Sequence, residues 1–291
     1  GEQIAWGESN AVAFANSVLG ARTIQYPDLL DVCAAITGRV PAVGLHLNEN
    51  RAGEILLKLI DIPEDLQADD SFAPVLGHLL GTIADDRVPV VEGLTVELPE
   101  DHLKAICAGG ASSGAVHLFH IVGQTPEALT RAEAFQGHEP TEVHDINLRD
   151  LRRIRSELDS SQGKSLDMIV LGSPHFSFAE FRKLAPMLEG QQCHTDVDFL
   201  VTSSRAMVKL ARESGMLDTL EAFGAKVTVD TCILTTPMLF PETRRLMTNS
   251  AKYAYYSPGL LDAEVAFGSM ADCVRSAISG RVQTNSSLWD S

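Results

Sequence analysis

The chain has 291 residues, with 39 acidic and 23 basic side chains and a formal net charge of −16 at pH 7. Apolar residues make up 45% and charged residues 21%, which excludes intrinsic disorder, collagen and a disulfide-stabilised miniprotein. The acidic balance argues against a nucleic-acid partner, because attraction to phosphate needs clustered Lys and Arg.

The first half of the chain alternates helical and extended patterns. Residues 8–19 carry an Ala and Val stripe typical of a helix, with Ser9 or Asn10 as N-cap. Residues 26–36 predict a second helix that ends at Gly38. The next predicted elements are a short strand at 39–47, helices at 54–62 and 72–83, a strand pair at 87–98, a helix at 99–108, a strand at 116–122 and a helix opened by Thr125.

The second half follows a cleaner pattern after a polar loop predicted at 134–146. Apolar runs at 168–171, 199–202, 227–231 and 265–268 read as buried strands, and helices are predicted at 178–188, 204–223 and 271–279. Strands separated by helices pair in parallel, and strands apolar on both faces belong to a covered sheet. We therefore predict an α/β fold of parallel, doubly wound sheets with helices on both faces.

Targeting and membrane signals are absent from the printed sequence. Its apolar runs are far shorter than the roughly 18–20 residues of a membrane span, and its start, GEQIAWGESN, has no basic and apolar leader. This start also reads as the middle of a domain, so we expect further residues before Gly1. We expect a cytoplasmic protein that has no membrane partner.

The cysteines argue against a disulfide framework. There are five, an odd number, and none forms a CxxC pair, so a zinc ribbon is also disfavoured. One hypothesis makes all five small buried hydrophobes in a reducing compartment. The other lets three thiolates converge on one pocket, where soft ligands would select iron or an iron–sulfur cluster.

Several motifs follow predicted strands, where open α/β sheets place their ligands. His175 follows the strand at 168–171, Cys232 ends the strand at 227–231, and Cys273 comes shortly after the last strand. Residues 248–259 bring amides, hydroxyls and an ammonium group together in a predicted loop. The run GGASSG at 109–114 is interpreted either as a structural turn or as a ligand loop that exposes backbone N–H groups.

A series of longer sequence motifs, in their order along the chain, resembles the large catalytic domain of aconitase X, a branch of the aconitase superfamily. The motifs include GESNAVAFANSVLGART, DLLDVCAAITGRVP, GLHL, ASSGAVHLFHIVGQTPEA, LGSPHFS, VDTC, TNSAKYAYYSPG and FGSMADCV. The resemblance covers residues 1–282, which we expect to divide into two α/β subdomains near 1–145 and 146–282. Residues 283–291 resemble nothing in the family and are treated as an unrelated tail.

The resemblance implies a hydro-lyase that removes water from a small hydroxylated carboxylate. In bacteria this family dehydrates cis-3-hydroxy-L-proline to a pyrroline-2-carboxylate, and in archaea it dehydrates mevalonate 5-phosphate. It also implies iron, as an iron–sulfur cluster or a mononuclear centre, held by Cys33, Cys232 and Cys273. Cys107 and Cys193 are then structural.

A substrate carboxylate needs fixed polar partners. Those expected from the resemblance carry hydroxyl, amide, imidazole or cationic groups: Ser9, Asn10, Asn16, Ser17, Arg22, His46, Ser112, Ser113 and Lys252. The family places its base, a serine, on a smaller swivelling domain or subunit that this sequence does not contain. We therefore predict no catalytic base in the chain and a small swivel domain or subunit as its partner.

Two other classes of function stay open at this point. One is a nucleotide- or phosphate-binding α/β protein that uses the GGASSG run as its cradle, although that run follows a predicted helix and not a strand. The other is a non-catalytic remnant that keeps the fold without the chemistry.

Overall fold

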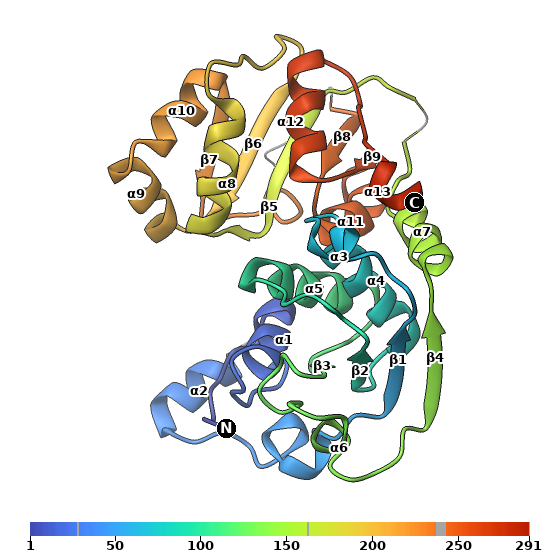
Figure 1. The fold of residues 1–291 in the computed structure, drawn as a ribbon. Helices are drawn as coiled ribbons and strands as arrows, with labels where there is room; N and C mark the ends of the chain where they lie inside the picture. Colours follow the sequence, from blue (N-terminus) through green and yellow to red (C-terminus); the bar gives the residue numbers. More distant parts are fainter. Residues whose placement is uncertain (28, 162, 237–242, 291) are drawn as a thin grey trace. The chain divides into compact units, whose positions relative to one another are not determined.

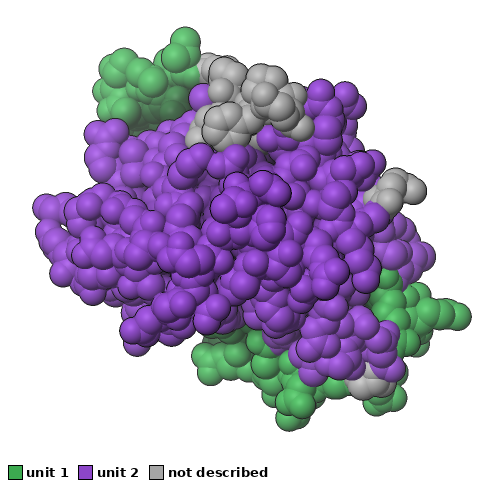
Figure 2. All heavy atoms as spheres, turned by 90° about the horizontal axis from the view of Figure 1, so that it is seen from above, with its two compact units in different colours: residues 1–68, 75–152 green, residues 69–74, 153–291 purple. Residues whose placement is uncertain are grey.

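The computed structural model describes residues 1–27, 29–161, 163–236 and 243–290, and they form two compact units. Unit 1 comprises residues 1–68 and 75–152, and unit 2 comprises residues 69–74 and 153–291 (Figures 1 and 2). In the part of the chain that is described, no helix has the length and apolar character needed to cross a lipid bilayer.

Unit 1 is built on a four-stranded parallel sheet in the order β3-β2-β1-β4. Its strands are β1 (Ile55–Leu59), β2 (Pro89–Glu92), β3 (His120–Ile121) and β4 (Glu142–Ile146). Its helices are α1 (Ser9–Ser17), α2 (Leu30–Thr37), η1 (Gly44–His46), η2 (Asn48–Asn50), α3 (Glu64–Ala68), most of α4 (Phe72–Ala84), α5 (Glu100–Ser113), α6 (Arg131–Ala134) and the first half of α7 (Leu148–Glu157).

Glycines of the GGASSG run allow the backbones of helices α4 and α5 to pack closely where the two helices cross. A Cβ on Gly81 of α4 would lie 2.6 Å from the Gly110 carbonyl oxygen, and one on Gly114 would lie 2.4 Å from the Gly81 carbonyl oxygen. Larger residues would force the two helix backbones apart. The run is therefore the last turns of α5, and our prediction of a turn or ligand loop there was wrong.

Arg51 ties together the irregular segments of unit 1. Its side chain is fully buried, and its Nε lies 2.8 Å from Oε2 of Glu127. Its two terminal nitrogens donate to the Asn16 side-chain oxygen and to the carbonyl oxygens of Leu45, Asn16 and Ala21. One guanidinium thus connects the end of α1, the η1 segment and the loop after β3.

Unit 2 is built on a five-stranded parallel sheet in the order β7-β6-β5-β8-β9. The strands are β5 (Met168–Phe176), β6 (Asp198–Ser203), β7 (Ala225–Val229), β8 (Arg245–Thr248) and β9 (Glu264–Phe267). The chain winds outward from β5 to β7 and then returns to the other side of β5. In open α/β sheets such a reversal, here between the carboxyl ends of β5 and β8, is the place where ligands bind.

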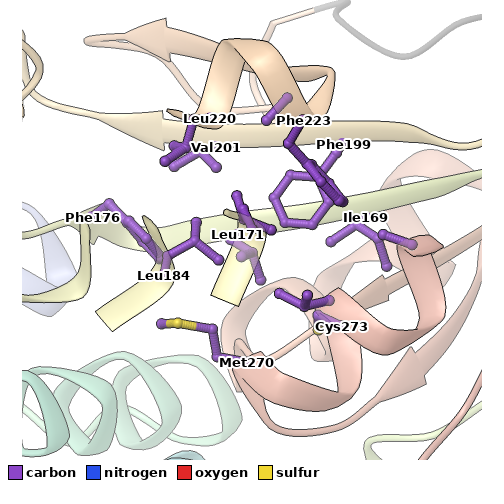
Figure 3. Packing of buried hydrophobic residues seen from close by; sticks show 14 of the residues in the cluster. Ile169, Leu171, Phe176, Leu184, Phe199, Val201, Leu220, Phe223, Met270 and Cys273 are labelled. Carbon is purple, nitrogen blue, oxygen red and sulfur yellow. The ribbon is translucent and has the colours of Figure 1, made fainter. Parts of the chain in front are cut away.

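Helices cover both faces of this sheet. Its helices are α8 (Phe178–Leu188), α9 (Arg205–Glu213), α10 (Met216–Phe223), α11 (Ala251–Leu261), α12 (Met270–Ser279) and α13 (Ser287–Asp290). Figure 3 shows Ile169 and Leu171 of β5 packed with residues of β6, α8, α10 and α12 in one apolar cluster. Helix α11 contributes nothing to that cluster and packs instead against β5, β8 and β9. The predicted α/β fold of doubly wound parallel sheets is confirmed.

Residues 283–290 pack on unit 2. The backbone N–H groups of Gln283 and Asn285 donate to the side chains of Ser276 and Asp272 in α12. Trp289 is buried, and its indole N–H lies 3.0 Å from the Ser71 hydroxyl. The segment that resembles nothing in the family therefore covers part of this unit.

Several local predictions were wrong, mostly in the first half. The predicted helix at 54–62 is strand β1, since ILLKLI suits either structure until neighbours pair with it. The strand predicted at 39–47 holds η1, the pair at 87–98 is the single strand β2, and the loop at 134–146 contains β4. Two further changes concern helices: the predicted helix at 204–223 breaks into α9 and α10, and the loop at 248–259 is largely α11.

We predict that Arg51→Ala lowers the free energy of unfolding by about 3–5 kcal/mol, because it leaves buried carbonyl groups and Glu127 without their partner. Urea unfolding followed by circular dichroism measures this. The matched control is Arg131→Ala, whose exposed ion pair with Glu92 spans 3.8 Å and should cost less than about 1 kcal/mol. Equal losses in the two variants would contradict the role given to Arg51.

Candidate functional site

The carboxyl ends of four strands in unit 2 bring together a set of polar side chains. We call it the switch-point cluster, and it consists of Ser173, Thr202, Cys232, Ser250 and Tyr253. Ser173 lies in the second half of β5 and Thr202 near the end of β6, Cys232 and Ser250 follow β7 and β8, and Tyr253 lies in the first turn of α11. These elements are labelled in Figure 1. Parallel pairing explains this meeting, since all four strands deliver their carboxyl ends to one edge.

The floor of the cluster is a tight contact between β5 and β6. Gly172 has a φ of 103°, and a Cβ there would lie 2.1 Å from the Thr202 carbonyl oxygen. Glycine is therefore required at this position. The Thr202 hydroxyl donates to the Gly172 carbonyl oxygen across 2.7 Å, and both residues are buried. This contact lies where the register between β5 and β6 shifts, between Leu171 and Phe176.

Ser250 fixes helix α11 to the end of β5. Its hydroxyl donates to the Ser173 carbonyl oxygen and accepts from the Tyr253 backbone N–H at 3.1 Å, which makes it the N-cap of α11. Tyr253 is fully buried, and its hydroxyl lies 3.2 Å from that of Thr202. Burial, followed by the nearby Cys232 thiol, raises the Tyr253 pKa above its ordinary value.

Cys232 is the half-buried thiol of the cluster, and a turn holds its backbone. Its carbonyl oxygen accepts from the N–H groups of Thr235 and Thr236 at 3.2 and 3.0 Å. Just before it, Asp230 adopts a φ of 53° and its side chain accepts from the Arg205 N–H at 3.0 Å. Two predicted residues border this region: Lys252 lies half-buried in the first turn of α11, and the exposed His175 donates from Nε2 to the Thr231 carbonyl oxygen at 2.9 Å.

Cys273 has different surroundings. It is fully buried in α12 within the apolar cluster of unit 2, near Ile169 and Met270 (Figure 3). Burial, followed by the nearby carboxylates of Asp272 and Asp70, raises the pKa of its thiol well above the ordinary range. These surroundings disfavour a thiolate, which is the metal-binding form. The predicted ligand role of Cys273 stays a prediction.

Cys107 and Cys193, the two cysteines predicted to be structural, also have raised pKa values. Burial raises the pKa of Cys107, which lies in α5. Cys193 is half-buried, and burial raises its pKa to about 11. Neither environment favours a thiolate at neutral pH, so both fit packing roles.

Cys33 lies in unit 1 on an apolar helix that contacts little. It belongs to α2, which has no buried residue, and its own side chain is exposed. Leu29 is 72% and Ile36 is 79% exposed on the same segment. An apolar helix is normally covered by other polypeptide. The exposed Cys33 thiol is accessible to a metal ion.

Asn16 and Ser17, which were predicted to bind substrate, hold unit 1 together. The Asn16 amide donates to the carbonyl oxygens of Thr23 and His117, and its oxygen accepts from the Thr23 N–H and from Arg51. All its ordinary hydrogen-bonding positions are thus used within the unit. The Ser17 hydroxyl accepts from the Phe119 N–H at 2.9 Å.

The remaining predicted serines also bond locally. Ser112 donates to the Ala108 carbonyl oxygen one turn earlier in α5 at 2.6 Å, and the Ser113 hydroxyl lies 2.8 Å from the His78 carbonyl oxygen of α4 and 3.0 Å from that of Gly109. Ser9 donates to Glu8, and Glu8 in place of Ser9 or Asn10 caps α1, so that part of our helix prediction was wrong. The side-chain oxygen of Asn10 is buried without a hydrogen-bond partner.

Arg22 and His46 lie in a second polar region, within unit 1. Arg22 lines an open cavity of about 370 Å³ together with Asn48, Arg51, His120 and Glu127, and its Nε has no hydrogen-bond partner. His46 is buried between Tyr26, whose hydroxyl donates to Nε2, and Gln3, whose side-chain oxygen accepts from Nδ1. Burial and then the nearby Arg51 charge lower the His46 pKa.

The described residues of each unit contain no cluster of three or more His, Cys, Asp or Glu side chains arranged to hold a metal ion. Considered one unit at a time, the thiol best suited to a metal in unit 2 is Cys232, and in unit 1 it is Cys33. Tyr253, Thr202 and Ser173 were not singled out from the sequence, although two of them lie in motifs that were.

Comparison with known proteins gives consistent matches along the chain. Three family models match in order: "Aconitase X first domain" at residues 1–49, "Aconitase X second domain" at 53–156 and "Aconitase X third domain" at 166–279. The crystal structure of the holo-form of aconitase X from Thermococcus kodakaraensis superposes with a TM-score of 0.82 at 29% identity, covering 94% of this chain and 68% of that one.

Two relatives illustrate the range of similarity among proteins of named activity. A cis-3-hydroxy-L-proline dehydratase from Pseudomonas aeruginosa is 45% identical over 99% of this chain and 50% of its own length. A phosphomevalonate dehydratase large subunit from Methanosarcina mazei is 34% identical over 97% of this chain and 66% of its own length. The chain therefore spans about half of the first relative and about two thirds of the second.

We predict that His46 makes the fold less stable in mild acid. Its folded pKa lies below the value of about 6.5 in the unfolded chain, so protons bind the unfolded state first and stability falls as pH drops below that value. The free energy of unfolding, measured from pH 8 to pH 5, should fall less steeply in His46→Gln than in the wild type. The exposed His138→Gln should keep the wild-type slope; an unchanged slope in His46→Gln would contradict the prediction.

Proposed function

The chain belongs to the aconitase X family, and we propose from this membership that it is the iron-binding part of a hydro-lyase that dehydrates cis-3-hydroxy-L-proline. The observation that carries the proposal is the 45% identity to a dehydratase of that substrate across 99% of the chain. A second relative of the same name, from Hypocrea jecorina, is 44% identical over 98% of the chain.

The alternative substrate is mevalonate 5-phosphate. The relatives named phosphomevalonate dehydratase large subunit are less similar, with 34% identity for the Methanosarcina mazei protein. The GGASSG run, which could have cradled a phosphate, lies within α5, where helix hydrogen bonds use its backbone N–H groups. Both observations favour the amino acid over the phosphate ester.

The reaction removes a proton from the carbon that carries the carboxylate and hydroxide from the neighbouring carbon, with no change of oxidation state. Hydroxide is a poor leaving group at neutral pH, and bound iron would supply a Lewis acid for it. Iron needs an open coordination position for this task, which fits a site with three protein ligands.

Among the predicted ligands, the two accessible thiols are Cys232 in the switch-point cluster and Cys33 on α2. We propose both as iron ligands, with Cys273 as the third predicted one. Lys252, at the start of α11, supplies a cation for the substrate carboxylate, and Arg22 lines the cavity of unit 1 with an unused N–H group. The chain's contribution is to hold iron and orient substrate.

The partner is a small swivel domain or subunit that carries the base for the proton. The name "large subunit" of the archaeal relatives supports a second component, and the exposed apolar side chains of α2 offer a surface for further polypeptide. A reducing compartment such as the cytoplasm suits the free thiols.

We predict that the iron-loaded chain dehydrates cis-3-hydroxy-L-proline when the small component is added. Without that component the rate should fall by about 10²–10⁴-fold, the usual contribution of a general base. Product formation under anaerobic conditions, followed by NMR on both substrates, measures this. No turnover with the small component present would contradict the enzyme proposal, and preference for mevalonate 5-phosphate would contradict the choice of substrate.

We predict that Cys232→Ser and Cys33→Ser each lose iron after anaerobic reconstitution, because each removes a soft ligand. The iron content per chain measures this, with Cys193→Ser as the half-buried control that should keep wild-type iron. Full iron content in Cys232→Ser would overturn its assignment. The same measurement on Cys273→Ser tests the third predicted ligand.

A further inference from the structure

The open cavity of unit 1 is lined by charged side chains of both signs. It has a volume of about 370 Å³, and its walls include Arg22, Arg51, Glu127 and Glu133. Small-molecule sites in proteins usually have volumes of about 300–1,000 Å³ and a few polar groups that converge on the ligand. The cavity therefore has the size of a small-ligand site, and the pairing of its charges indicates what the ligand carries.

Arg51 and Glu127 satisfy each other and leave little for a ligand. The Nε–H of the fully buried Arg51 donates to the Glu127 carboxylate, whose two oxygens lie at 2.8 and 3.1 Å. The terminal N–H groups donate to the Asn16 side chain and to the carbonyl oxygens of Leu45, Asn16 and Ala21. All the N–H groups of this guanidinium are thus used, and the pair has a structural role.

Arg22 is the cation of the cavity that lacks an anionic partner. One of its N–H groups donates to the Asn48 side-chain oxygen at 2.9 Å and another to the His46 carbonyl oxygen at 3.4 Å. Both acceptors are neutral, and the buried Nε–H has no acceptor at all. In the described part of the chain, no carboxylate forms an ion pair with Arg22. Its guanidinium therefore keeps N–H groups unbonded within the chain, and a carboxylate fits the planar edge of such a group.

Glu133 is the anion of the cavity that lacks a cationic partner. Its Oε2 accepts from the Thr130 N–H at 2.9 Å in the capping box of α6, and its Oε1 has no bond within the described residues. The neighbouring Arg131 pairs instead with Glu92, at 3.8 Å. The exposed Glu133 carboxylate is thus available to a cationic group of a ligand.

The four charged side chains of the cavity sum to zero, which disfavours a ligand of one sign. A simple anion bound to Arg22 would also face Glu127 and Glu133. A simple cation bound to Glu133 would also face Arg22 and Arg51. His120 on the same wall adds no charge, because its Nε2–H donates to the Arg51 carbonyl oxygen at 2.8 Å and burial lowers its pKa. A ligand that carries both signs avoids both repulsions.

We propose that this cavity is a binding site for a small amino acid in its zwitterionic form, with the carboxylate on Arg22 and the ammonium group on Glu133. The walls already carry one unpaired cation and one unpaired anion, and the ligand completes both. The cavity shares no residue with the switch-point cluster and requires no iron. The proposal thus gives unit 1 a ligand of its own, beyond the proposed dehydration reaction.

Neutral side chains hold the two unpaired charges in place before a ligand binds. The Gln136 amide donates to the Asn48 carbonyl oxygen at 2.8 Å, and the Asn48 side chain accepts from Arg22. Gln136 lies two residues beyond α6, whose capping box fixes Glu133. These contacts connect the cationic wall to the anionic wall. A site that is ordered before binding loses less entropy when the ligand binds.

Isothermal titration calorimetry of the metal-free chain at neutral pH tests the proposal. The probe is L-proline, which carries both charges but has no hydroxyl to lose. Acetate carries only the carboxylate and pyrrolidine only the ammonium group. Each should bind about tenfold or more weakly than L-proline, because each lacks one charged contact. No binding of L-proline, or equal binding of acetate or pyrrolidine, would overturn the proposal.

Two variants locate the binding. Arg22→Gln and Glu133→Gln should each weaken L-proline binding about 10- to 100-fold, the usual contribution of a hydrogen bond to a charged group. Glu133→Gln should fold, because a capping box accepts Gln as well as Glu. The matched controls are Arg39→Gln and Glu139→Gln, which remove exposed charges of unit 1 that do not line the cavity and should leave binding unchanged. Wild-type affinity in Glu133→Gln would contradict the ammonium site.

A variant of unit 2 separates this site from the proposed iron site. Cys232→Ser should bind L-proline as the wild type does, because Cys232 belongs to unit 2 and does not line the cavity. Loss of binding in Cys232→Ser, with none in Arg22→Gln, would place the ligand elsewhere and overturn the proposal. A chain that binds L-proline through Arg22 and Glu133 but dehydrates no substrate would contradict the proposed function alone.

Discussion

The parallel sheet of unit 2 is the constraint on which the rest of this account depends. Because β5 to β8 all run in one direction, their carboxyl ends meet at one edge, and the winding reverses between β5 and β8, where open α/β sheets place their ligands. Gly172 lets β5 and β6 approach closely enough for the Thr202 hydroxyl to bond across them. The switch-point cluster follows directly: a thiol, a phenol and three hydroxyls held by backbone contacts of a rigid sheet.

Unit 1 also depends on a buried cation, Arg51, which holds segments outside its sheet together. Arg51 gathers carbonyl oxygens from three segments that are neither paired strands nor long helices, and Glu127 balances its charge. Much of the polar sequence that resembled a substrate site is part of this network, as for Asn16, or bonds within its own helix, as for Ser112. Arg22, by contrast, lines the cavity with an N–H group still unused.

The sequence predicted the second sheet well and the first poorly, for physical reasons. Buried strands such as 199–202 are apolar on both faces and lie between capped helices, so their pattern has one interpretation. The run 54–62 has the same apolar content but needed its neighbours β2 and β4 to become a strand. The glycines of GGASSG are needed for the close packing of α5 on α4, which a local sequence pattern could not indicate because the contacts come from a distant part of the chain. Cys232 was found because it follows a predicted strand, whereas Tyr253 was missed because the partner of its hydroxyl, Thr202, comes from another element.

The central claim is that Cys232 is an iron ligand at the carboxyl edge of the unit 2 sheet. The most direct measurement is iron K-edge X-ray absorption of the anaerobically reconstituted chain, comparing the wild type with Cys232→Ser. The account predicts sulfur neighbours near ~2.3 Å, the usual length of a metal–thiolate bond, and one sulfur fewer in the variant. The same sulfur coordination in both proteins would contradict it.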